Sequence, residues 1–262
     1  MTQKHALEHF RSRLEAALGA DSRIDAVLEA GSNAIGRGDR FSDLDLVIVA
    51  TPDGYEDLLK ERLVLARELG DLLSCFSGEH VGEPRLLICL FSLEDGDRLL
   101  HVDLKFVEHA DLLDRVDDPR VLFDHSGRSR SLMRQTPAVW PERDPQWFED
   151  RVWVWLHYAA ARAGRGEFYE AIDSLTFIRG QVLAPMLARE AGLPQRGVRR
   201  IEQVPGASAA LRDTLAEPER VELRQALQTS AELYLSLREG QPPLERRIAA
   251  QQRVFAYFDL AL

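Results

Sequence analysis

Positive charge is scarce in this 262-residue sequence, because 33 lysines and arginines stand against 43 aspartates and glutamates, a formal net charge of -10. A protein that follows a polynucleotide without sequence preference needs a basic surface along the phosphates. The charge therefore disfavours that class of protein, and nucleic acid is not an expected partner. A small substrate, for example a cationic one, fits this composition better.

Cysteines and long apolar runs are also few. The two cysteines, Cys75 and Cys89, have no His or Cys neighbour at metal-binding spacing. We predict two buried free thiols, as in a protein of the reducing cytoplasm. The longest apolar run, residues 86–91, is too short to span a membrane, and the charged N-terminal segment is unlike a signal peptide. We therefore expect a cytoplasmic protein with no membrane association.

The most informative pattern lies in residues 31–50. Asp43 and Asp45 open an apolar, β-branched run that ends at Ala50, and this run is predicted to form a buried strand. Alternate side chains of a strand point to the same face, so the two carboxylates should lie side by side. Carboxylate oxygens suit Mg2+, which takes one or two of them and completes its shell with water and phosphate oxygens.

A polar, glycine-rich segment precedes these aspartates. Gly31 allows the backbone to approach a ligand closely, and Ser32 offers a hydroxyl and a backbone N–H to phosphate oxygens. Arg37 and Arg40 follow in the same loop, where a guanidinium could bind the terminal phosphates through two hydrogen bonds. The simpler interpretation of each arginine is a solvent-exposed loop charge.

A third carboxylate, Asp103, lies in another predicted strand, residues 99–107. Aspartate is uncommon inside strands, so three aspartates in two otherwise apolar strands favour metal ligands over solvated surface acids. Lys105 should share the face of Asp103, where it would either reach a phosphate or neutralise the carboxylates.

A Gly-Ser turn, then Asp-x-Asp opening a strand, then a later strand with a third aspartate, resembles the signature of the nucleotidyltransferase superfamily, whose core is like that of DNA polymerase β. The motifs cover roughly residues 20–110. Within the superfamily the chain looks most like the antibiotic adenylyltransferases that modify aminoglycosides or lincosamides. In those enzymes, too, a catalytic domain is followed by a helical bundle.

The resemblance implies a Mg2+-dependent enzyme that moves a nucleoside monophosphate, AMP from ATP, to a hydroxyl of a small acceptor such as an aminoglycoside or lincosamide, and so confers antibiotic resistance. In such an enzyme two Mg2+ ions would be held by Asp43, Asp45 and Asp103, which are then the catalytic residues. The candidates for nucleotide binding are Gly31, Ser32, Arg37, Arg40 and Lys105.

Other functions stay open from the sequence. One is transfer to a protein or a tRNA, as in the small nucleotidyltransferases of toxin–antitoxin pairs. Another is a non-catalytic nucleotide-binding regulatory module, which the intact set of three aspartates disfavours. A glycosyltransferase with a metal-binding Asp-x-Asp would require neither the Gly-Ser turn nor Asp103. The acceptor, the general base (Glu79, Glu83 or Asp103) and the formation of a homodimer are left open.

Hydrophobic periodicity predicts an α+β protein. A catalytic domain with a mixed sheet and flanking helices should occupy residues 1–125, followed by a proline-punctuated linker at 126–145 and a helical bundle at 146–262. The strands are expected at residues 24–30, 43–50, 73–76, 85–91 and 99–107, with a turn at 94–97.

Overall fold

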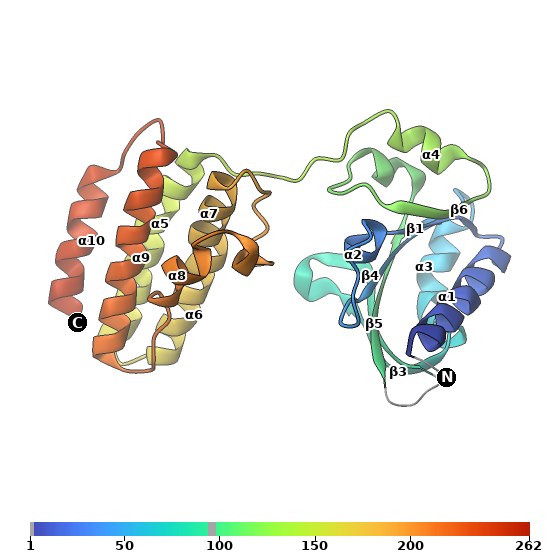
Figure 1. Cartoon of the computed structure of the whole chain (residues 1–262), viewed down its shortest axis with the longest axis horizontal. Helices are drawn as coiled ribbons and strands as arrows, with labels where there is room; N and C mark the ends of the chain where they lie inside the picture. Colours follow the sequence, from blue (N-terminus) through green and yellow to red (C-terminus); the bar gives the residue numbers. More distant parts are fainter. Residues whose placement is uncertain (1–2, 94–97) are drawn as a thin grey trace. The chain divides into compact units, whose positions relative to one another are not determined.

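A computed structural model describes residues 3–93 and 98–262 of the chain (Figure 1). The chain divides into two compact units, Met1–Val139 and Trp140–Leu262, and each unit has its own hydrophobic core. The predicted turn at residues 94–97 lies outside the described residues. Within the described residues, every helix is too short or too polar to span a lipid bilayer.

A six-stranded mixed sheet forms the centre of the first unit, in the order β3-β4-β5-β2-β1-β6. Strands β2 and β5 are parallel, and all other neighbours are antiparallel. The sequence did not predict β6, whose short apolar stretch carries no clear periodicity. The strands are β1 (Ile24–Glu29), β2 (Leu44–Ala50), β3 (Asp71–Gly78), β4 (Glu83–Ser92), β5 (Leu99–Val107) and β6 (Arg120–Asp124).

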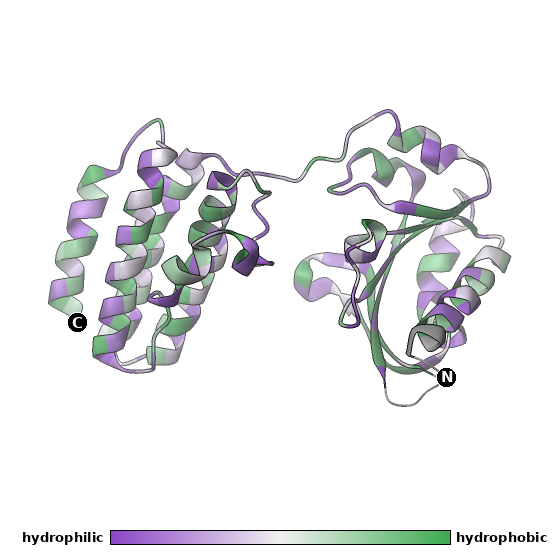
Figure 2. Cartoon of the chain, in the orientation of Figure 1, coloured by the Kyte–Doolittle hydropathy of each residue, from purple (hydrophilic) through white to green (hydrophobic). Residues whose placement is uncertain are grey.

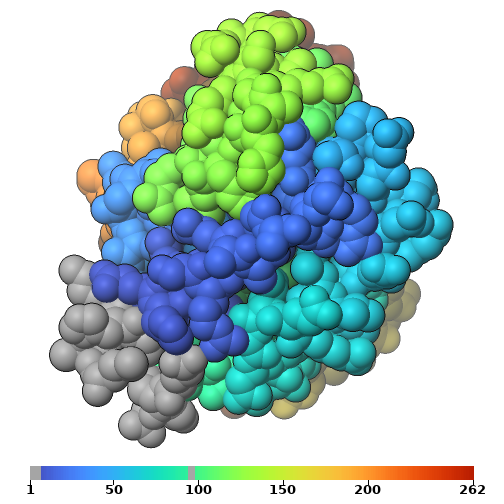
Figure 3. Space-filling view, turned by 90° about the vertical axis from the view of Figure 1, so that its right-hand side faces the viewer, coloured from blue at the N-terminus to red at the C-terminus, as the bar shows by residue number. Residues whose placement is uncertain are grey.

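Two helices, α1 (Gln3–Ala20) and α3 (Tyr55–Glu68), cover one face of this sheet (Figure 1). In the space-filling view, α1 crosses the middle of that face in dark blue (Figure 3). Alternate side chains of the strands point toward these helices and are buried against them. Together they form the larger hydrophobic core of the unit. Its members include Phe10, Leu14, Leu58, Leu46, Ile48, Val102, Leu104 and Phe106.

A smaller core covers part of the opposite sheet face. It is built under the short helix η2 (His109–Leu113) and helix α4 (Arg128–Met133), which lies within the segment expected to be the linker. The side chains at positions 45, 103 and 105 alternate onto this second face, because their neighbours 44, 46, 102, 104 and 106 point into the larger core. The small core comprises Ala26, Leu28, Val49, Val107 and Leu112, with Met133 packed against it.

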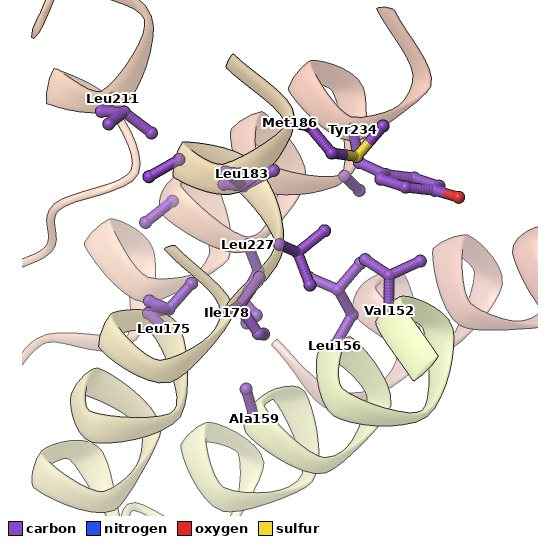
Figure 4. Packing of buried hydrophobic residues seen from close by; sticks show 14 of the residues in the cluster. Val152, Leu156, Ala159, Leu175, Ile178, Leu183, Met186, Leu211, Leu227 and Tyr234 are labelled. Carbon is purple, nitrogen blue, oxygen red and sulfur yellow. The ribbon is translucent and has the colours of Figure 1, made fainter. Parts of the chain in front are cut away.

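The second unit is entirely helical in its regular structure. Hydrophobic and hydrophilic residues alternate in bands along its helices (Figure 2), and the hydrophobic bands meet in one core (Figure 4). All four tryptophans of the chain, at positions 140, 147, 153 and 155, belong to this unit. Its elements are α5 (Pro145–Gly164), α6 (Phe168–Ile178), the π-helical turn η3 (Arg179–Leu183), α7 (Ala184–Glu190), η4 (Ile201–Gln203), α8 (Ala207–Arg212), α9 (Arg220–Gly240) and α10 (Ile248–Ala261).

The fold class predicted from the sequence, α+β with a mixed sheet followed by a helical region, is confirmed. The five strands that the sequence predicted are present, with β3 and β4 somewhat longer than expected. Asp43, which was expected inside the second strand, lies just before β2. At the Gly-Ser turn that the sequence predicts, the chain forms the short helix α2 (Gly31–Ala34).

Candidate active site

The parallel pairing of β2 with β5 brings two of the predicted ligands together. Its register sets Asp45 directly beside Asp103. Both side chains are half-buried, and the flanking leucines and valines are buried on the other face. The two carboxylates therefore share one sheet face at adjacent positions of neighbouring strands, as the alternation of side chains requires.

Asp43 lies immediately before β2, and its negative charge acts on the carboxylate of Asp103. Burial raises the pKa of Asp103 above its usual range, and the negative charge of Asp43 raises it further. Three acids at this position thus concentrate negative charge that a bound cation would relieve.

His101 is a site residue that the sequence interpretation missed. Its ring Nε2 lies 2.8 Å from Asp103 Oδ1, and this contact opposes the rise in the pKa of Asp103. The two residues are separated by one position on β5, so they share a face. That spacing is the signal that could have identified the histidine from the sequence.

Gly31 packs against the carboxylate of Asp45. Its backbone has φ +69°, and any Cβ at this position would collide with Asp45 Oδ2. Both the conformation and the close approach therefore require glycine. The neighbouring backbone N–H of Ala30 donates to the carbonyl oxygen of Asp45 at 2.8 Å, which ties the turn to the strand.

The loop between Gly31 and Asp43 is closed by its own polar groups. Ser32 is buried, and its Oγ lies 3.1 Å from Ser42 Oγ. Asn33 Nδ2 donates to the carbonyl oxygen of Asp43 at 2.6 Å. The hydrogen bond of the Ser32 hydroxyl thus stabilises the loop, and the contact from Asn33 fixes the backbone of Asp43 at the start of β2.

The two loop arginines are exposed. The guanidinium of Arg40 lies 4.4 Å from the ring centroid of Phe41, itself an exposed aromatic residue. Arg37 is held through its backbone N–H, which donates to the carbonyl oxygen of Ser32 at 2.9 Å. Both cations extend from the loop that leads to Asp43.

Lys105 shares the sheet face of Asp103, yet its ammonium pairs with Glu83 at 2.9 Å. Arg85 is the other partner of Glu83, also at 2.9 Å. These contacts, that of Arg85 first, lower the pKa of Glu83 to about 2. A carboxylate held so firmly in its ionised form is a poor proton acceptor, so Glu83 does not suit the role of general base.

The donor set fits a hard divalent cation in its chemistry. Across residues 3–93 and 98–262, no group of three or more His, Cys, Asp or Glu side chains is arranged to hold a metal ion, so Asp43, Asp45 and Asp103 do not form a complete metal site by themselves. Mg2+ does not require one, because it binds through one or two carboxylates and takes its remaining ligands from water and phosphate. The aligned pair Asp45 and Asp103, with Asp43 beside them, matches that requirement.

The helical unit has a separate hollow of about 460 Å3. Trp155 and Phe177 meet there edge to face, with ring centroids 4.9 Å apart. Glu170 accepts a hydrogen bond from the hydroxyl of Tyr158, and the exposed Asp173 adds a second acid. Aromatic rings combined with carboxylates are suited to an organic cation.

No protein-family model matches the sequence, and no curated protein matches it significantly. The solved structures that are similar to the chain include two that align over 95% of its length. One is an aminoglycoside 6-adenyltransferase from Bacillus subtilis (TM-score 0.37, 14% identity, 96% of that chain covered). The other is a nucleotidyltransferase-like protein from Exiguobacterium sibiricum (TM-score 0.40, 13% identity, 78% covered).

The function is inferred from the aspartates of β2 and β5 and from the turn that packs against them.

Proposed function

We propose that this protein is a Mg2+-dependent nucleotidyltransferase that moves AMP from ATP to a hydroxyl group of a small acceptor. One observation carries the proposal: the parallel register of β2 and β5 aligns Asp45 with Asp103, and Asp43 adds its charge to the pair. A bound pair of divalent cations would neutralise the triphosphate and polarise the transferred phosphoryl group.

Different residues of the chain would bind the cations and the phosphates of the substrate. The three carboxylates would hold the cations, and the absence of a side chain at Gly31 would let the triphosphate approach Asp45. The exposed Arg37 and Arg40 are free to rotate toward the β- and γ-phosphates, to which a guanidinium binds bidentately. Ser32 would contribute its backbone N–H, since its hydroxyl is engaged with Ser42.

Lys105 has a dual role in this proposal. An ammonium group has three N–H donors, and the ion pair with Glu83 uses one of them. The remaining donors would be available to a phosphate oxygen above Asp103. Glu83 then keeps the lysine on the correct side of the sheet.

We infer that the acceptor is cationic, as an aminoglycoside is. The formal net charge of -10 favours the approach of such a molecule. The hollow of the helical unit, with its aromatic rings and the acids Glu170 and Asp173, has the chemistry to bind amino groups on a partly apolar body.

The deciding experiment measures transfer from labelled ATP in the presence of Mg2+ to a panel of aminoglycosides, lincosamides and tRNA. We expect label on a cationic small molecule and release of pyrophosphate. Asp45→Asn and Asp103→Asn should each lower the rate by about 100-fold or more, because a direct ligand matters at least as much as its supporting shell.

The matched control is Asp71→Asn, since Asp71 is an exposed aspartate at the start of β3. It should transfer at the rate of the unchanged protein. Full activity of either ligand variant would refute the metal assignment. Label on tRNA alone would favour the nucleic-acid alternative, and no transfer together with intact Mg2+–ATP binding would favour a regulatory module.

A further inference from the structure

The two cysteines of the chain meet across the β3–β4 pair. Cys75 and Cys89 are separated by fourteen positions in sequence, yet they are direct partners in the antiparallel register. Their Sγ atoms lie 2.9 Å apart, and both thiols are free.

The register itself satisfies the geometry of a disulfide. Directly opposed residues of antiparallel strands have Cα atoms about 4.5–5.5 Å apart, and disulfides occur at Cα separations of roughly 4.4–6.8 Å. A bond between the two sulfurs therefore requires only small side-chain rotations, with the strands left in place.

The two thiols differ in access. Cys89 is 2% exposed and belongs to the core beneath α1 and α3. Cys75 is half-buried on the edge strand and lines an open hollow of about 500 Å3 between β3 and α3. Burial also raises the pKa of Cys89, and the contact with Cys75 raises it further. A small reagent would therefore react first at Cys75.

We propose that Cys75 and Cys89 form a redox modification site, in which a low-molecular-weight disulfide of the glutathione class converts the pair to a cross-strand disulfide. Both thiols are free, as the sequence predicts, but Cys75 is only half-buried and lines a hollow, which corrects the expectation that both are buried. The site lies on the helix-covered side of the sheet, opposite the face of Asp103, and it stands independently of the proposed nucleotidyl transfer.

The chemistry is a two-step thiol–disulfide exchange. The Cys75 thiolate attacks one sulfur of oxidised glutathione, which forms a mixed disulfide and releases one glutathione thiolate. Cys89 then attacks the Sγ of Cys75 and expels the second glutathione, which takes up the proton that Cys89 gives up. Two protein thiols are oxidised and one glutathione disulfide is reduced to two thiols, so atoms and electrons balance.

The full chain, incubated with oxidised glutathione in anaerobic buffer, tests the proposal through intact mass and peptide mapping. We expect a product that has lost two hydrogen atoms, a peptide that links positions 75 and 89, and full reversal by dithiothreitol. Far-UV circular dichroism verifies that each protein sample is folded.

Two single variants provide the sharpest contrast, because the thiols differ in burial. Cys89→Ser should stop at a stable glutathione adduct on Cys75, since the resolving thiol is missing. Cys75→Ser should acquire no adduct while it is folded, since Cys89 is enclosed. Two unmodified thiols in the folded full chain would overturn the proposal. So would an adduct on Cys89 of the Cys75→Ser protein, or a link between two chains in place of the internal bond.

Discussion

Glu83 is the residue whose ionisation the structure constrains most clearly. Its carboxylate pairs with Arg85 at 2.9 Å and with Lys105 at 2.9 Å, and Arg85 also reaches Asp111 at 3.0 Å. These contacts link β4, β5 and the helix η2 that follows β5. The contacts with Arg85 first, and then with Lys105, lower the pKa of Glu83 to about 2, against an ordinary value of 4.5.

A pKa that is lower in the folded state means that the ionised carboxylate stabilises the fold. That contribution is complete above the unfolded pKa, and it is lost as the pH falls from about 4.5 to about 2. We expect Glu83→Gln to lower the free energy of unfolding by about 1 kcal/mol at neutral pH. Urea denaturation followed by far-UV circular dichroism should find this difference shrinking through the acidic window.

Glu68→Gln is the matched control, because Glu68 is exposed in the last turn of α3. The free energy of unfolding of the Glu68→Gln protein should equal that of the unchanged protein at every pH. A Glu83→Gln difference that persisted undiminished at pH values near 2 would contradict the ion-pair origin.

At the scale of elements, one buried carboxylate joins α5 to α9. Glu149 is fully buried and accepts hydrogen bonds from Trp153 Nε1 at 3.1 Å and from the hydroxyl of Tyr234. It also accepts the backbone N–H of Arg247 at 2.7 Å and lies 3.3 Å from the guanidinium of Arg238. Burial opposes ionisation of this group, but the hydrogen bonds, that of Tyr234 first, leave its pKa below the usual range.

Removal of this charge should destabilise the helical unit strongly, because the buried Arg238 would lose its counter-ion. We expect Glu149→Gln to lower the free energy of unfolding by about 3 kcal/mol. Glu170→Gln is the control: Glu170 also accepts a tyrosine hydroxyl and pairs with an arginine, but at the surface. It should cost about 1 kcal/mol or less. Differential scanning calorimetry distinguishes the two, and equal effects would contradict the role of burial.

The elements differ in how well their sequence predicts them. Strand β2 is recognisable from its β-branched run, and the alternation within β2 and β5 suffices to assign Asp45 and Asp103 to strand faces. The contacts between strands depend on register, which periodicity does not specify. The meeting of Cys75 with Cys89 and the pairing of Lys105 with Glu83 could not be predicted for that reason.

At the scale of the whole molecule, two separate cores imply two units that each hold their own structure. Residues 1–139 bury the helix faces of α1 and α3 against the sheet, and residues 140–262 bury α5, α6 and α9 against one another. A compact unit with its own core can fold alone. From the sequence, a division was expected at the proline-punctuated segment 126–145, and helix α4 within that segment was not predicted.

We expect the fragments 1–139 and 140–262, expressed separately, to fold independently. The first should have mixed α/β circular dichroism and the second a helical spectrum, and the two spectra should sum to that of the full chain. Each fragment should unfold cooperatively in calorimetry. A fragment that stayed unfolded until its partner was added would contradict the independence of the cores.

The segregation of the tryptophans has a practical optical consequence. Every indole of the chain lies at or beyond position 140, whereas the sheet unit holds none. The intrinsic fluorescence of the intact protein, excited at the red edge where tyrosine does not absorb, is therefore emitted by the helical unit alone. A ligand that quenches this tryptophan fluorescence would therefore be acting near the helical unit. A ligand that binds only at the aspartates of the sheet would leave the fluorescence unchanged.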